Sequence, residues 1–157
     1  MTIAITSPCS EDYNCIAWAA DDSETWWWPN SFGLSYWPLY PAGDTSLENF
    51  INAYSTLGYE RCQDATLEAG FKKVALYIDD ANQVTHAARQ LDNGDWTSKL
   101  GKLYDIKHLF VEVWQDIAYG QTCPVKKTGI TAVVLELGYA NNLNHEEDSR
   151  WHILTRS

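Results

Sequence analysis

Two stretches of the chain carry apolar residues at the spacing of one helical face. The first covers residues 47–57, where Thr45 and Glu48 form a capping box and Gly58 supplies the stop. The second begins at Asp105, which we expect to act as the N-cap, has its last apolar position of the pattern at Ile117, and ends at Tyr119-Gly120. The pattern therefore predicts two amphipathic helices of moderate length.

Other stretches favour strands. In residues 72–79, the alternating residues Val74, Leu76 and Ile78 share one face of a predicted strand, and residues 129–136 form a mostly buried strand. Residues 84–91 and 96–101 flank Asn93-Gly94, a strong hairpin signal. The hairpin register stays open, because a one-residue shift exchanges the two faces of a strand. A two-residue turn places Gln90, Thr97 and Lys99 on the face of His86, whereas a three-residue turn with a bulge places Trp96, Ser98 and Leu100 there.

The remaining segments complete the predicted organisation. Residues 1–12 are expected to form an irregular arm, residues 13–20 a short helix, and residues 24–43 a long loop held by aromatic packing. We predict a single domain over residues 1–140, followed by a polar C-terminal tail over residues 141–157. Helical and antiparallel strand segments are separate along the chain, which predicts the α+β class.

The composition of the chain narrows the range of possible functions. Of the 157 residues, 11 are basic and 21 acidic, giving a net charge of −10. Such a charge disfavours binding to nucleic acid or to a membrane surface. The sequence shows neither an apolar run of membrane-spanning length nor a signal peptide at its start, so we expect a cytoplasmic protein. The four cysteines lack zinc-site spacing, and we expect free thiols, no metal and no cofactor.

Cys15 is the candidate nucleophile. It lies at the start of the predicted short helix, where unpaired amides favour the thiolate over the thiol. His86 opens the first hairpin strand beside two alanines, which makes it the candidate base. The Cys15 amide and the Asn14 side chain are the expected oxyanion donors. We therefore hypothesise that the Cys15 sulfur and the His86 imidazole meet between helix and sheet.

Several motifs resemble a known family. The runs Asn14–Ala19, Trp27–Pro29, Leu57–Tyr59, Thr85–Gln90 and Trp96–Gly101 resemble an uncharacterised bacterial domain family of unknown function, over roughly residues 8–120. More loosely, an Asn-Cys pair at a helix start followed by a hairpin headed by histidine is similar to papain-like peptidases of the NlpC type.

The looser resemblance implies a papain-like fold, in which an N-terminal helix carrying Cys15 packs on a small antiparallel sheet. It also implies a Cys15 nucleophile, a His86 base and a third polar residue, Ser98 or Lys99, that orients the imidazole. Ser98 departs from the His, Asn or Gln expected at that place in the family.

Two functions follow as expectations. The first is a cysteine-dependent amide or thioester hydrolase or acyltransferase acting on a peptide or another amide substrate, with a pocket lined by Trp18, Trp26, Trp27 and Trp28. The alternative is a non-catalytic binding or immunity-type module, whose tryptophan-rich loop holds a protein or glycan partner. In one variant of that alternative, the acidic chain covers a basic surface of its partner.

Overall fold

The computed structural model describes residues 3–30, 32–109, 111, 131–140 and 152–154. Within them are two short helices, α1 (Cys15–Ala19) and α2 (Leu47–Ser55). The strands are β1 (Ile3–Ile5), β2 (Glu60–Arg61), β3 (Phe71–Ile78), β4 (Val84–Gln90), β5 (Trp96–Lys99), β6 (Asp105–His108), β7 (Thr131–Ala140) and β8 (His152–Leu154).

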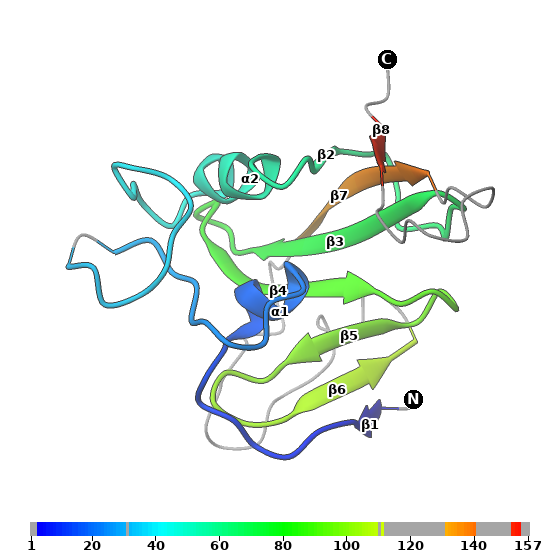
Figure 1. Ribbon diagram of the computed structural model, residues 1–157, viewed down its shortest axis with the longest axis horizontal. Coiled ribbons are helices and arrows are strands. Elements are labelled where there is room, and N and C mark those ends of the chain that lie inside the picture. Colours follow the sequence, from blue (N-terminus) through cyan, green and yellow to red (C-terminus); the bar gives the residue numbers. More distant parts are fainter. Residues whose placement is uncertain (1–2, 31, 110, 112–130, 141–151, 155–157) are drawn as a thin grey trace.

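The strands form one antiparallel sheet in the order β1-β6-β5-β4-β3-β7-β2, with β8 paired to β7 (Figure 1). Strand β3 is central because it pairs with β4 on one side and with β7 on the other. Residues 74–78 of β3 form a continuous apolar run, and Val74–Tyr77 are buried, so both faces of the strand are covered.

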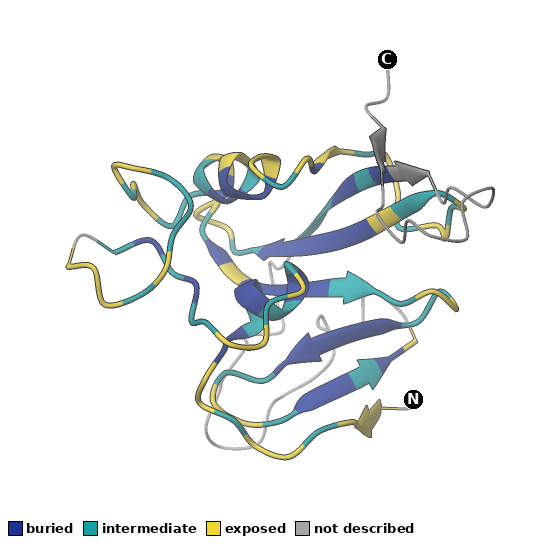
Figure 2. Ribbon diagram, viewed as in Figure 1, coloured by how far each residue is buried: buried dark blue, intermediate teal, exposed yellow. Residues whose placement is uncertain are grey.

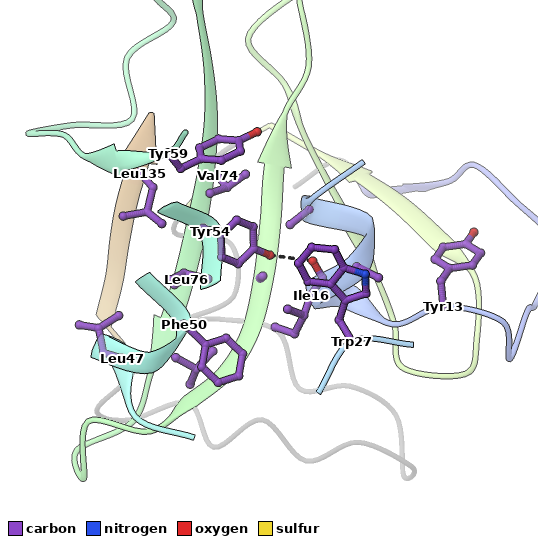
Figure 3. Packing of buried hydrophobic residues seen from close by; sticks show 14 residues of the cluster. Tyr13, Ile16, Trp27, Leu47, Phe50, Tyr54, Tyr59, Val74, Leu76 and Leu135 are labelled. Atoms are coloured by element: carbon purple, nitrogen blue, oxygen red, sulfur yellow. Dashed lines mark hydrogen bonds between the residues drawn. The ribbon is translucent and has the colours of Figure 1, made fainter. Parts of the chain in front are cut away.

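The two faces of the sheet carry separate apolar clusters. The first cluster joins α1 and α2 to Val74, Leu76 and Ala87 of the sheet (Figure 3). The second cluster includes Ala75, Tyr77, Ala88, Trp96, Ile106 and Val111. Successive residues of a strand point to opposite faces. Ala87 and Ala88 therefore belong to different clusters. Figure 2 shows β3 and β5 mostly in dark blue, so consecutive residues of these strands are buried.

The prediction of a papain-like α+β fold is wrong. The described part of the chain is mostly antiparallel sheet, and its helices are only five and nine residues long. The physical reason is that the second predicted amphipathic helix does not begin at Asp105. Residues Asp105–His108 form β6 instead, since β5 and β1 supply backbone partners on its two sides. Most of the rest of that predicted helix lies outside the described residues.

In the first 60 residues, the two helices lie where they were predicted, but the N-cap of α2 and the structure of the N-terminal arm differ from the prediction. Helix α1 lies inside the predicted segment 13–20, and α2 inside 47–57. The N-cap of α2 is Ser46, whose side chain accepts from Asn49 N, rather than Thr45. The Thr45 hydroxyl instead donates to the Gln83 side chain. The predicted arm contains β1, which pairs with β6.

The hairpin adopts the second of the two registers. Gln90 pairs with Trp96 and Arg89 with Thr97, which sets Trp96 and Ser98 on the His86 face. Gly94 adopts a φ of 93°, a conformation that glycine reaches without strain.

The predicted strand 129–136 corresponds to β7. The predicted tail, residues 141–157, lies outside the described residues except for β8. In the described part of the chain, no helix has the length and apolar character needed to span a bilayer.

Candidate functional site

Cys15 begins α1 and is half-buried against the first apolar cluster. The helix forms here because Asn14 adopts an extended backbone conformation and caps it through its side chain. The Asn14 Oδ1 atom accepts from Ala17 N at 3.1 Å and from Trp27 N at 3.3 Å, while its Nδ2 donates to Trp27 O at 2.6 Å. The predicted oxyanion donor is therefore engaged in fixing α1 to the aromatic loop.

Lys99 lies on the same sheet face as Cys15. Its ammonium donates to Ser10 O at 2.7 Å and to Gly101 O at 2.6 Å, and lies 4.8 Å from the centre of the Tyr13 ring. Burial lowers the pKa of Lys99, while the nearby Asp105 and Cys15 oppose that shift. The lysine thus ties the N-terminal segment to the β5–β6 turn.

His86 and Ser98 lie together on the other face of the sheet. The His86 ring packs against Tyr77, with the ring centres 5.5 Å apart, and Tyr77 belongs to the second cluster. Ser98 Oγ lies 3.0 Å from Nε2 of His108, which is also buried. Burial, and secondarily the charge of His108, lower the pKa of His86 to about 3. This face holds a neutral histidine among apolar side chains at pH 7.

The structure does not bring Cys15 and His86 together. The β4 residue that meets α1 in the first cluster is Ala87, whereas His86 points to the second cluster. The predicted catalytic and orienting residues therefore lie on two faces of the sheet. Cys15, Asn14 and Lys99 lie on one face, and His86 and Ser98 lie on the other. The two groups are separated because successive side chains of a strand point to opposite faces, and the spacing of motifs in the sequence does not reveal which face a residue takes.

The tryptophans predicted to line a pocket have mainly structural contacts. Trp18 donates to Thr97 Oγ1 at 3.1 Å. Trp27 is buried and donates to Asp22 Oδ2 at 2.8 Å, and Trp28 packs edge-on against Phe50. Trp26 is half-buried and its carbonyl accepts from Tyr36 N. The tryptophan run therefore anchors the loop to the body of the protein.

Sequence reasoning missed the exposed residues of the same loop. Phe32 is 83% exposed, Leu34 84% and Tyr40 101%. We call these three residues the apolar tip; the loops that carry them project to the left in Figure 1. Their signal in the sequence was weak, because they fit no helix or strand period.

Among the described residues, no group of three or more His, Cys, Asp or Glu side chains could hold a metal ion. Neither a curated protein nor a solved structure matches the chain. A family model, described as Domain of unknown function (DUF7689), matches residues 4–127. Because this match covers most of the sequence, the chain belongs to the DUF7689 family.

Proposed function

We propose that this protein is a binding module whose apolar tip docks onto a cationic protein partner. The observation that carries the proposal is the exposure of Phe32, Leu34 and Tyr40 within the aromatic segment 24–43. Large apolar side chains concentrated on a projecting surface mark interaction sites more often than isolated ones do. Aromatic side chains are also the usual anchors of protein interfaces.

Local hydrogen bonds support the part of the loop that carries Phe32 and Leu34. Trp28 N donates to Tyr36 O at 3.0 Å, and Tyr36 N donates to Trp26 O at 2.9 Å, so two strands of the loop pair locally. The Asn30 side chain accepts from Leu34 N at 3.3 Å, which closes the turn between them. A preorganised surface loses less entropy on binding than a flexible one. These contacts support a binding role for the tip.

Charge supports a cationic partner. Residues 1–60, which include the whole loop, contain eight acidic residues and no Lys, Arg or His. The exposed carboxylates Glu24 and Asp44 lie on the segments that enter and leave the loop. A surface of one sign attracts a partner of the opposite sign and raises its association rate. An apolar tip with acidic flanks therefore fits a basic surface that has an apolar recess.

Cysteine-dependent hydrolysis stays an untested prediction, and the positions of Cys15 and His86 do not favour it. Acyl transfer by a cysteine needs a base within hydrogen-bond reach of the sulfur. The two side chains belong to opposite faces of the sheet.

The test is selection of random short peptides displayed on phage against the purified protein. We expect the enriched peptides to carry net positive charge together with apolar residues. Their affinity should fall at least about tenfold when Phe32, Leu34 and Tyr40 are all replaced by Ser. It should also fall when salt rises from about 50 mM to about 300 mM, because the flanking carboxylates become screened.

The matched control is Ile5→Ser, which removes an apolar side chain that is 62% exposed on β1. The control variant should bind the peptides like the wild type. Circular dichroism checks that both variants remain folded. The proposal fails if no peptide is enriched, if binding survives the triple substitution, or if the enriched peptides are acidic.

A further inference from the structure

A cavity of about 510 Å³ lies where β3 and β4 separate. Pairing between these strands starts at Val74 and Arg89, whereas β3 already pairs with β7 from Phe71. Figure 1 shows the fork that results to the right of the paired region. The cavity has the size of typical small-molecule sites. It lies apart from the apolar tip and shares no lining residue with it.

Arg89 contributes a guanidinium to the wall of this cavity. Its guanidinium lies 4.3 Å from the centre of the Trp18 ring, and its Nη1 lies 3.3 Å from Asp21 Oδ1. Asp21 reaches it from a left-handed conformation with a φ of 65°, which costs free energy in a residue other than glycine. The guanidinium is thus held in place from two sides.

The hydrogen-bonding capacity of Arg89 is nevertheless unused. Within the described part of the chain the guanidinium donates no hydrogen bond, and its Nε atom is buried without an acceptor. An unsatisfied buried donor costs roughly 1–3 kcal/mol in a folded protein. An oriented guanidinium with free donors is the group that binds carboxylates in a bidentate manner.

Two further polar side chains of the wall have a hydrogen-bonding atom with no partner among the described residues. No described residue hydrogen-bonds to the Tyr59 hydroxyl, and burial raises the Tyr59 pKa to about 12, so the hydroxyl keeps its proton and can donate. Gln90 donates through Nε2 to Ala65 O at 2.9 Å, while its Oε1 is buried with no donor among the described residues. Gln90 follows Arg89 on β4 and therefore points to the opposite face of the sheet, so the donors available on the α1 face are Arg89 and Tyr59.

The rest of the cavity is suited to an apolar group of modest size. Leu67, Phe71 and Leu91 line it. Three carboxylates and three cationic side chains also line it, so the wall carries no net charge. A ligand that joins a carboxylate to an apolar side chain would use both the two donors and the apolar lining.

We infer that this cavity binds the carboxylate end of an apolar amino-acid unit, with Arg89 and Tyr59 donating to the carboxylate. An N-acylated amino acid and the C-terminal residue of a peptide share this chemistry. The inference is independent of the proposed docking at the apolar tip, since it rests on other residues.

The test is titration calorimetry of the full-length protein with four probes. These are N-acetyl-L-leucine, the tripeptide Gly-Gly-Leu, and the C-terminal amide of each. We expect at least one of the two carboxylates to bind, and its amide to bind at least about tenfold more weakly. Binding of acetyl-leucine alone assigns a small-molecule ligand, and binding of the tripeptide alone assigns a peptide C-terminus.

Variants connect binding to the wall. Arg89→Gln should lower the affinity for the carboxylate probe at least about tenfold. Tyr59→Phe should lower it about three- to tenfold, because this substitution removes one hydrogen bond without changing the ring. Arg61→Gln is the matched control, because Arg61 lies outside this cavity and pairs with Glu48. The inference is overturned if no probe binds at about 10 mM, if amides bind as well as acids, or if Tyr59→Phe and Arg89→Gln both bind normally.

Discussion

The hydroxyl of Tyr54 donates a hydrogen bond of 2.7 Å to the carbonyl oxygen of Ile16, and so joins α2 to α1 across 38 residues of sequence (Figure 3). Both residues are completely buried in the first apolar cluster. Strong desolvation raises the pKa of Tyr54 well above 10, so the hydroxyl stays protonated. The two short helices are therefore fixed to each other by a polar contact inside an apolar environment.

We expect Tyr54→Phe to lower the free energy of unfolding by about 1 kcal/mol, since it deletes this buried hydrogen bond and leaves the ring in place. Tyr59→Phe is the matched control, because the Tyr59 ring packs edge-on against Tyr54 and no described residue hydrogen-bonds to its hydroxyl. Urea unfolding of the two variants makes the comparison. Equal losses of stability would show that the contact with Ile16 contributes nothing specific.

His86 should make the protein unstable in acid. The folded ring titrates with a pKa of about 3 and the unfolded one near 6.5, so the unfolded state binds more protons between these values. Stability is therefore complete above pH 6.5 and falls as the pH decreases. Relative to His86→Gln, the wild type should lose about 3 kcal/mol between pH 6.5 and pH 4. Urea unfolding at several pH values measures this, and parallel stability curves for the two proteins would contradict it.

Asn14 should be the most sensitive polar residue of α1. Asn14→Ala removes the helix cap and both contacts with the Trp27 backbone, and we expect a loss of about 2–3 kcal/mol in unfolding free energy. Asn14→Asp keeps the capping oxygen and removes the donor to Trp27 O, so its loss should be smaller. Asn52→Ala, at an exposed site of α2, is the control and should change stability little. If Asn14→Ala lost less unfolding free energy than Asn14→Asp, the side-chain cap would not be the source of the stability.

The reactivity of Cys15 should not depend on His86. The two lie on different faces of the sheet, so His86→Gln should change the rate at which iodoacetamide labels Cys15 by less than about twofold at pH 7. Cys62 should react slowly in the same protein, because burial raises its pKa to about 11. Mass spectrometry of the labelled peptides gives both rates. A tenfold fall in Cys15 labelling would restore the pair as a catalytic hypothesis.

The local elements could be predicted because their causes lie within a few residues. The position of α1 follows from the Asn14 cap, that of α2 from its apolar spacing, and that of β3 from its alternation. Asn93-Gly94 identified the hairpin between β4 and β5. A capping side chain, a turn or an apolar pattern is a local property of the chain, so the sequence carries this information directly.

The tertiary structure decided the rest. The segment that starts at Asp105 has helical spacing, yet β5 and β1 offer it backbone partners and it becomes a strand. The face on which His86 lies depends on strand pairing, where a shift of one residue reverses inside and outside. Exposure of Phe32, Leu34 and Tyr40 depends on how the neighbouring tryptophans pack. The sequence by itself determined which short segments are ordered, whereas contacts between distant segments determined which side chains meet, because those contacts form only when the whole sheet is assembled.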